Sequence, residues 1–419
     1  MARQMKVPLR VGAPRDDNPR DGTPRNRVRS GFHPTFVCGR FENPKLQHTT
    51  RISETCKKRE PKRAMIYGVI MAGGAGTRLW PASRQEKPKQ FLPLTGQHSM
   101  IRQTADRINP LTGDERIMVI TSEHHTEQTL KNIPYLRPEM VIGEPMARNT
   151  APCIALAAAR LHAADPDAVM IVLPADHHIE KKEAFLEILR TAVEEAREHH
   201  TLVTIGIQPT HPETGYGYIQ AKDASHQTGN TLPVERFVEK PNLARAEEFL
   251  RSGEYMWNSG MFVWRASSIL QAMEEHMPDL FTLTLGVRGA QLTRPDLLAF
   301  FEGAPAVSID VGVMERASNV KVIPADIGWS DVGSWKAVYD LSVKDAEGNA
   351  ENIASEGAGA SGSATNATFI GAMNNLVMTE TGKRVVLIGV EDLCVVETED
   401  AVLVLHRDQA QRVKEAVQK

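Results

Sequence analysis

The sequence predicts an α/β protein: a Rossmann-like domain with a mostly parallel sheet, followed by a small β module of the β-solenoid type and a terminal helix. Three observations lead to this fold class. Short apolar runs alternate with amphipathic helical segments over residues 65–342, which is typical of βαβ units. Short, evenly spaced apolar runs with turn residues between them follow over residues 343–419. Residues 1–64 show neither pattern and form a third segment.

Length and composition exclude several classes of protein. The 419 residues allow roughly two to four domains, and 41% hydrophobic with 24% charged residues is typical of a soluble globular chain. No stretch approaches the ~20 uninterrupted apolar residues of a membrane span, so we predict no membrane partner. The four cysteines lie far apart without a CxxC pair, which excludes a disulfide scaffold and a zinc ribbon. This pattern favours a reducing, cytoplasmic location.

Residues 1–64 are basic, with 16 Lys and Arg against 6 Asp and Glu. They are rich in Arg, Pro, Asn and Gly and would bury too little apolar surface to offset their ordering entropy, so we predict disorder. We favour a start site placed too far upstream, because Met65 directly precedes the first apolar run. A solvated tail is the next interpretation. An arm that binds nucleic acid ranks last and would show a strongly salt-dependent affinity.

The first domain, residues 65–342, contains clear strand and helix patterns. Strands are predicted at residues 66–71, 116–121, 168–173 and 202–207, where apolar runs suit buried parallel strands. One helix begins at a cap formed by Asn149 or Thr150, with Pro152 in its first turn. Another helix covers residues 182–199, with Phe185, Leu189 and Val193 on one face.

The second domain, residues 343–419, begins with a stretch at 346–367 that is rich in Gly, Ser, Ala and Asn and predicts a loop or linker. Strands are then predicted at residues 368–371, 375–379, 385–390, 393–397 and 401–405, before a closing helix at 407–418. We interpret this module as a structural cap on the first domain, without a catalytic role.

A glycine-rich loop, GGAGTR at residues 73–78, directly follows the first predicted strand. Glycines let the backbone approach a ligand and turn its N–H groups toward an anion. Arg78, and Lys89 in the sequence KPKQF, would add positive charge for phosphate groups. The loop is not a P-loop, because no Gly-Lys-Ser/Thr follows, and the sequence LWP at 79–81 stands where a dinucleotide-binding helix should open.

Two aspartates are candidates for a metal site. Asp176 follows the predicted strand at 168–173, where open α/β sheets place their ligands, and a carboxylate there suits Mg²⁺. Asp331, in a Gly/Ser turn, offers a second carboxylate that could converge on the same ion. The alternative for Asp176 is that it caps the next helix. The histidine pairs at 124–125, 177–178 and 199–200 are interpreted as surface or loop residues, because sequence neighbours point in different directions.

A third group of polar residues suits a sugar phosphate. Glu239 and Asn258 are suited to hydroxyl groups, and Lys240 to a phosphate. Gly217 lies in a Gly-rich turn that a flat ligand face could approach. Taken singly, each of these residues fits a solvated turn equally well.

Seven ordered motifs resemble the sugar-nucleotide pyrophosphorylases, and more narrowly the bacterial mannose-1-phosphate guanylyltransferases. The resemblance covers essentially all of residues 65–340 and extends to the β module, whereas residues 1–64 lie outside it. The motifs are MAGGAGTR (71–78), KPKQF (87–91), GEPMARNTAP (143–152), PADH (174–177), FVEKP (237–241), WNSGMF (257–262) and WSDVGSW (329–335).

The resemblance implies transfer of GMP from GTP to α-D-mannose 1-phosphate by a Mg²⁺-assisted direct in-line displacement, which gives GDP-mannose and pyrophosphate. It implies Arg78, Lys89 and Asp176 as catalytic residues, and Asp176 and Asp331 as metal ligands. The nucleotide contacts would come from Ala72, Gly73, Gly74, Gly76, Thr77, Arg78, Lys89, Glu144, Asn149 and Thr150. The sugar phosphate contacts would come from Gly217, Glu239, Lys240, Asn258 and Asp310.

Two positions depart from the family pattern. Val311 and Gly312 follow Asp310 where the family more often has Tyr-Ala, which leaves the wall of the sugar pocket open to question. Cys153 replaces a usual alanine and is nearly isosteric with it. Longer relatives append a phosphomannose isomerase domain with a His-rich metal site. No HxH-type ligand set follows Leu341, so the chain is expected to be the monofunctional short form.

Two other functions stay open at this stage. One is a UTP- or dTTP-dependent hexose-1-phosphate nucleotidylyltransferase, although such relatives usually lack the sequence RNTAP found at 148–152. The other is a catalytically silent homologue that senses sugar nucleotides. The complete set of charged site residues argues against this second function. The sequence leaves the oligomeric state open, a homodimer included.

Overall fold

The computed structural model describes residues 65–74, 77–222, 228–289, 291–353 and 366–417. The chain divides into two units, Met1–Glu60 and Pro61–Lys419, and all described residues belong to the second. The predictions for residues 1–64 and for Gly76 lie outside the described residues. None of the helices in the described part of the chain is long and apolar enough to cross a bilayer.

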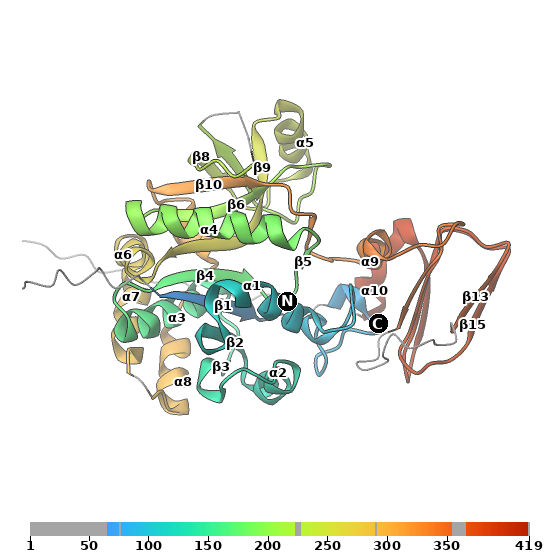
Figure 1. The fold of residues 1–419 in the computed structure, drawn as a ribbon, viewed down its shortest axis with the longest axis horizontal. Helices are drawn as coiled ribbons and strands as arrows, with labels where there is room; N and C mark the ends of the chain where they lie inside the picture. Colours follow the sequence, from blue (N-terminus) through green and yellow to red (C-terminus); the bar gives the residue numbers. More distant parts are fainter. Residues whose placement is uncertain (1–64, 75–76, 223–227, 290, 354–365, 418–419) are drawn as a thin grey trace, which may run out of the picture. The chain divides into compact units, whose positions relative to one another are not determined.

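A nine-stranded sheet forms the centre of the first domain (Figure 1). Its strand order is β3-β2-β1-β4-β9-β6-β10-β8-β7. The strands are β1 (Ile66–Ala72), β2 (Ile117–Ser122), β3 (Val141–Glu144), β4 (Val169–Pro174), β6 (Leu202–Ile207), β7 (Tyr218–Ala221), β8 (Leu232–Val238), β9 (Tyr255–Arg265) and β10 (Val320–Ala325). The four strands predicted for this domain fall within one residue of β1, β2, β4 and β6.

The sheet is parallel on one side and mixed on the other. Strands β3, β2, β1 and β4 run parallel, and so do β6 and β10. Between these two groups lies β9, which is antiparallel to both β4 and β6. Because β9 is the longest strand and is buried almost throughout, it joins both groups into one apolar core.

Helices cover the sheet, and their ends follow local signals. The Asn149 side chain accepts a hydrogen bond from Thr150 N and thereby caps α3, as the sequence indicates. Helix α4 packs on β4, β6 and β9 with Phe185, Leu189 and Val193 buried. The helices are α1 (Met100–Thr112), α2 (Thr126–Asn132), α3 (Thr150–Ala164), α4 (Lys182–His199), α5 (Leu243–Ser252), α6 (Ala266–His276), α7 (Pro278–Thr284), α8 (Arg294–Gly303) and α9 (Trp335–Leu341).

Short elements connect these parts. A π-helical turn covers Asp310–Met314, and two-residue strands β5 (His178–Ile179) and β11 (Trp329–Ser330) pair outside the main sheet. The 3-10 turns are η1 (Thr77–Leu79), η2 (Lys89–Phe91), η3 (Asp114–Arg116), η4 (Glu123–His125), η5 (Pro138–Met140), η6 (Leu285–Val287) and η8 (Arg407–Arg412).

The second domain is a parallel β-helix, as the solenoid prediction required (Figure 1). Parallel pairing joins β12 to β14 and β14 to β16, and likewise β13 to β15, while β17 closes the module antiparallel to β16. Its elements are β12 (Ala350–Ile353), β13 (Ala367–Ile370), β14 (Leu376–Thr379), β15 (Val385–Ile388), β16 (Leu393–Glu397), β17 (Val402–His406) and α10 (Val413–Val417).

The prediction of a linker throughout residues 346–367 is wrong at β12. The sequence AENI carries no apolar run, so its strand is not visible from periodicity. The strand forms because its neighbours supply the bonds: Ala350 N donates to Asn375 O at 2.7 Å, and Asn375 Nδ2 donates to Asn349 Oδ1 at 3.0 Å. Asparagines of successive coils therefore stack on one another and define this strand. These contacts join residues far apart in the sequence, so a local pattern does not predict them. Residues 354–365 lie outside the described part.

Candidate functional site

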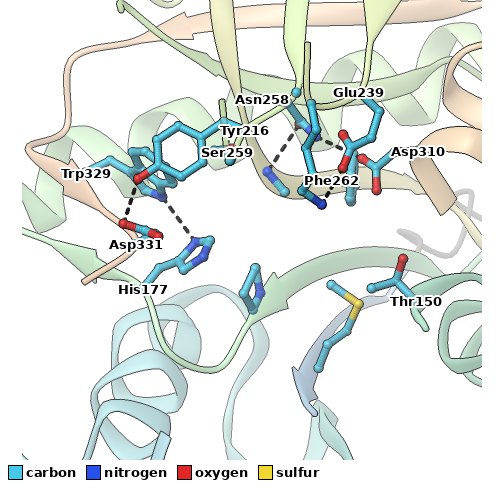
Figure 2. Close-up of a pocket in the computed structure, with 16 residues that line it drawn as sticks. Thr150, His177, Tyr216, Glu239, Asn258, Ser259, Phe262, Asp310, Trp329 and Asp331 are labelled. Atoms are coloured by element: carbon cyan, nitrogen blue, oxygen red, sulfur yellow. Dashed lines mark hydrogen bonds and ion pairs between the residues drawn. The ribbon is translucent and has the colours of Figure 1, made fainter. Parts of the chain in front are cut away.

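A cavity of about 260 Å³ opens near the carboxyl ends of β1 and β4, the edge at which open α/β sheets bind ligands. Figure 2 shows two groups of polar side chains in it: His177, Tyr216, Trp329 and Asp331 at one end, and Glu239, Asn258 and Asp310 at the other. The cavity is lined by Met71, Thr150, Pro174, His177, Gly215, Tyr216, Gly217, Glu239, Lys240, Asn258, Ser259, Gly260, Phe262, Asp310, Trp329 and Asp331.

Lys89 brings the two candidate metal ligands together. Its ammonium group donates to Asp176 Oδ2 at 2.9 Å and also to the backbone carbonyl oxygen of Asp331. Only 6% of Lys89 is exposed, so a single buried cation links two loops that are 155 positions apart in the sequence. The folded chain therefore holds the Asp331 loop against Asp176, and the carboxylates of both aspartates are near enough to His177 to affect its pKa.

Strands β5 and β11 explain why these loops meet. Asp176 lies two residues before β5 and Asp331 directly follows β11, and the two strands pair antiparallel with Ile179 opposite Trp329. In addition, Trp329 Nε1 donates to His177 Nδ1 at 3.1 Å (Figure 2). Strands of two residues have no periodicity to detect, so the sequence does not predict this strand pairing or the Trp329–His177 hydrogen bond.

The carboxyl of Asp176 is kept ionised. Burial by itself would raise its pKa, but the charge of Lys89 and the hydrogen bond from its ammonium group outweigh burial, so the pKa of Asp176 lies below its ordinary value. Burial is the main reason why the pKa of His177 is lowered. The imidazole is therefore neutral at pH 7, and the bond from Trp329 to Nδ1 leaves the proton on Nε2. His177 lies in the loop between β4 and β5, as predicted, and it also lines the cavity, which the sequence did not predict.

Tyr216 is a site residue that the sequence analysis missed. Its hydroxyl donates to Asp331 Oδ1 at 2.6 Å (Figure 2). Its ring meets those of Trp257 and Trp329 edge-on at 5.3 and 5.2 Å. Burial raises the pKa of Tyr216, and Asp331 raises it further, so the hydroxyl stays a donor. Tyr216 lies in the Gly-rich turn noted in the sequence, and an aromatic residue between its two glycines was the available signal.

Replacing Tyr216 by phenylalanine should weaken activation by a divalent cation about tenfold to a hundredfold, since Asp331 loses the bond that orients its carboxylate. Turnover measured against cation concentration tests this expectation. Tyr255→Phe is the matched control, because that hydroxyl donates to Gln220 Oε1 at 3.0 Å. An unchanged cation requirement in Tyr216→Phe would contradict the orienting role.

Asn258 organises the other end of the cavity. Its Nδ2 donates to Asp310 Oδ1 at 2.8 Å, and its backbone N–H donates to Gly217 O at 2.8 Å. A Cβ on residue 217 would lie 2.7 Å from Glu239 Oε2, so only glycine allows this carboxylate to approach. Lys240, at a φ of 43°, pairs with Glu239 Oε1 at 2.7 Å and is more exposed than its partner. The predicted sugar-phosphate residues thus lie together, and their roles stay predictions.

Burial, followed by repulsion from Glu239, raises the pKa of Asp310 to about 6. A carboxyl whose pKa rises on folding binds its proton more tightly in the folded state, so stability is lost as the pH rises from about 4 through 6. Asp310→Asn should therefore have a higher Tm than wild type at pH 7.5, and the difference should vanish near pH 4. Thermal unfolding across this range tests it, with the exposed Asp326→Asn as control. A lower Tm for Asp310→Asn at pH 7.5 would contradict the expectation.

Met277 explains how the wall beside Asp310 tolerates its unusual sequence. A Cβ on Gly312 would overlap Met277 Sδ, so the methionine fills the space that an alanine methyl group would take. Val311, the other departure from the family pattern, is exposed.

Among the described residues predicted to contact the nucleotide, only Thr150 lines the cavity. Gly73 and Gly74 are exposed, and Gly74 has a φ of 98° that requires glycine. Arg78 is exposed too, and its charge lowers the pKa of Tyr216 against the larger opposing effects. The carbonyl oxygen of Ala72 is already an acceptor for Gln90 Nε2 and Thr121 Oγ1.

The segment at 144–150 lies beyond β3. Glu144 is half-buried, its Oε1 has no hydrogen-bond partner among the described residues, and burial raises its pKa to about 7. Thr150 Oγ1 accepts a hydrogen bond from Ile309 N at 2.9 Å and lines the cavity, which leaves its hydroxyl proton free to donate. Asn149 is occupied with capping α3.

The carboxylates suit a hard divalent cation. No cluster of three or more His, Cys, Asp or Glu side chains that could hold a metal occurs in the described part of the chain. Asp176 and Asp331 offer two carboxylates, whereas zinc sites take three or four protein ligands. Mg²⁺ is commonly bound by one or two carboxylates, with waters and substrate phosphates as the other ligands. The donor set therefore suits magnesium.

Comparison with known proteins identifies the family. Residues 67–348 match the family model described as nucleotidyl transferase, and residues 366–419 match the mannoseP isomerase/GMP-like beta-helix domain. The chain is 43% identical over 363 residues to the xanthan biosynthesis protein XanB of Xanthomonas campestris pv. campestris (strain B100), covering 84% of this chain and 72% of XanB. It is 41% identical to the mannose-1-phosphate guanylyltransferase of Klebsiella pneumoniae, covering 84% of this chain and 74% of that protein.

A solved structure agrees with these relatives. The crystal structure of mannose-1-phosphate geranyltransferase from Thermus thermophilus superposes with a TM-score of 0.73 at 32% identity, covering 84% of this chain and 98% of that one. The fold, the two matched domains and the identities agree over most of the chain. The chain belongs to the nucleotidyl transferase family and, within it, to the mannose-1-phosphate guanylyltransferases.

Proposed function

We propose that this protein transfers GMP from GTP to α-D-mannose 1-phosphate and releases pyrophosphate. The observation that carries the proposal is the placement of Lys89 between Asp176 and Asp331, beside a cavity whose far end gathers Glu239 and Asn258. One end supplies charge for phosphates, and the other supplies hydrogen-bonding groups for a sugar. Relatives of 41% and 43% identity carry the names mannose-1-phosphate guanylyltransferase and XanB.

The reaction is a displacement at phosphorus. An oxygen of the sugar phosphate forms a bond to the α-phosphorus of GTP, and the bond from that phosphorus to the bridging oxygen breaks, so pyrophosphate leaves with the electron pair. Because the attacking oxygen is already anionic, no general base is required. The obstacle is the approach of two anions, and Lys89 and Arg78 would offset their charge. A guanylylated protein trapped by rapid quenching would contradict direct displacement.

Enzymes of this family generally use a divalent cation, and we propose Mg²⁺ held by Asp176 and Asp331. When bound, the ion supplies positive charge to the phosphate oxygens and aligns them. Tyr216 orients the Asp331 carboxylate, and Lys89 keeps both aspartate loops in place.

The remaining residues divide between the two substrates. Glu239, Asn258 and Asp310 would bind the hydroxyl groups of the sugar, and the exposed ammonium of Lys240 would reach its phosphate. Glu144, with its unpartnered oxygen, suits the N–H donors of a guanine. The buried, free thiols Cys153 and Cys394 suit a reducing compartment such as the cytoplasm.

The decisive experiment measures pyrophosphate release by the full chain with GTP, ATP, UTP and dTTP, each with mannose 1-phosphate or glucose 1-phosphate, with and without Mg²⁺. We expect GTP with mannose 1-phosphate to give the highest kcat/KM and the reaction to require the cation. Faster turnover with UTP or dTTP and glucose 1-phosphate would establish the hexose-1-phosphate alternative. No turnover with any pair, together with tight binding of a sugar nucleotide, would establish the silent sensor.

A further inference from the structure

We propose that the β-helix positions Lys89 through an ion pair between Lys87 and Glu380, so that the module is a working part of the transfer site. Lys87 lies two residues before Lys89, and its Nζ is 2.7 Å from Glu380 Oε1, directly after β14. The proposal rests on the proposed function only in that Lys89 serves the transfer. It assigns a role to two residues that do not line the cavity.

The backbone transmits the position of Lys87 to Lys89. Lys87 N donates to Arg84 O at 3.2 Å and Arg84 N donates to Lys87 O at 3.0 Å, which closes a tight turn. Pro88, with its fixed φ, leads from this turn into the 3-10 turn η2, in which Leu92 N donates to Lys89 O at 3.0 Å. A displacement of Lys87 therefore moves Lys89. The buried ammonium group of Lys89 would then no longer be placed to donate to both Asp176 Oδ2 and Asp331 O.

The β-helix also packs against the loop that carries Asp331, whose backbone carbonyl accepts a hydrogen bond from Lys89. Val332 follows Asp331 at a φ of 48°, a conformation that is strained for a β-branched residue and persists only where the surroundings enforce it. Its side chain is fully buried in an apolar cluster with Leu376 and Met378 of β14. This packing holds the turn that aims the Asp331 carbonyl at Lys89.

The Lys89 segment enters the same cluster. Leu92 and Leu94, which follow η2, are buried against the module, and Asn352 Nδ2 of β12 donates to Leu94 O at 2.8 Å. The Lys89 segment and the Asp331 loop therefore pack on the same apolar cluster, to which the β-helix contributes. Apolar packing is non-directional, so the cluster alone does not fix where the Lys89 segment lies along the surface of the β-helix. The Lys87–Glu380 ion pair supplies a directional contact that does.

A structural cap and a positioning module predict different results. An ion pair with both partners about one-third exposed contributes little to stability, so breaking it should barely change Tm. A misplaced catalytic lysine, in contrast, lowers kcat strongly even for small displacements. Positioning thus appears as a fall in kcat without a matching loss of stability.

The test uses Glu380→Gln in the full chain, with the nucleotide and sugar phosphate that the wild-type protein turns over fastest. We expect kcat to fall roughly threefold to tenfold, KM for the sugar phosphate to stay within about twofold, and Tm to shift by less than about 2 °C. Asp340→Asn is the matched control, because it breaks the exposed Lys336–Asp340 pair of 2.6 Å within α9. The charge-swapped double variant Lys87→Glu/Glu380→Lys should recover most of the lost turnover.

A second readout does not depend on turnover, and so separates this proposal from the substrate assignment. Acylation of lysines by an amine-reactive ester, followed by mass spectrometry, should modify Lys89 severalfold faster in Glu380→Gln than in wild type, where 6% of the residue is exposed. Lys336 should react equally in both. Unchanged kcat and unchanged Lys89 labelling in Glu380→Gln would overturn the proposal, as would a Lys87→Met defect that Glu380→Gln does not share.

Discussion

Lys89→Ala is expected to lower kcat by about 10²–10³, a loss of the size measured when a transition-state charge stabiliser is removed. The ammonium is the only described cation that contacts both aspartate loops, and it lies within hydrogen-bond distance of Asp176. In the proposed mechanism its removal takes away positive charge where the two phosphates meet. KM for GTP should change far less, because the proposal assigns most contacts with the nucleotide to other residues.

The measurement is steady-state pyrophosphate release by purified Lys89→Ala with saturating GTP, mannose 1-phosphate and Mg²⁺. Lys181→Ala is the control, since that lysine forms an exposed ion pair with Asp326 at 2.7 Å and should leave kcat unchanged. A thermal unfolding curve shows whether the variant is folded. Near-normal turnover by a folded Lys89→Ala would remove Lys89 from the catalytic residues.

Local signals made much of the first domain predictable. Strands β1, β4 and β6 are continuous apolar runs, as strands buried on both faces must be, and α4 has one apolar face. The Asn149 cap marks the start of α3. Each of these features depends on neighbours within a few residues, so the sequence contains the information needed to place it.

The contacts that build the site are not local. The sequence offers the convergence of Asp176 and Asp331 only as a hypothesis. Their loops are joined through Lys89 and through two strands of two residues, and neither of these features has a local signal. Tyr216 was missed for the same reason, since its role appears only once Asp331 lies beside it. Strand β12 has no apolar pattern and is defined by its partner β14.

The prediction for the histidine pairs is correct but incomplete at His177, which lies in a loop and also lines the cavity. Neighbouring side chains do point in different directions, as the sequence argument states. In the pair at 177–178, the consequence is that His177 faces the cavity while His178 lies in β5. Because neighbouring side chains point in different directions, two adjacent histidines are not expected to bind the same metal ion. This argument does not exclude one histidine of a pair from the site.

Asp176→Asn should lower kcat by about 10²–10³ or more, and additional Mg²⁺ should restore little of it. The amide keeps the size of the side chain and still accepts a hydrogen bond from Lys89, so the fold is preserved while the charge is lost. Kinetics across a range of cation concentrations measure the effect. The exposed Asp326→Asn serves as the control for loss of a carboxylate.

The double variant with Asp331→Asn gives the sharper test, because two ligands of one ion act as a unit. If both carboxylates hold the same cation, the first substitution already removes most of what the second can remove. The double variant should then be about as slow as the slower single variant. Independent roles would instead multiply the two losses. Multiplied losses would contradict a shared ion, even though Lys89 holds both loops in one place.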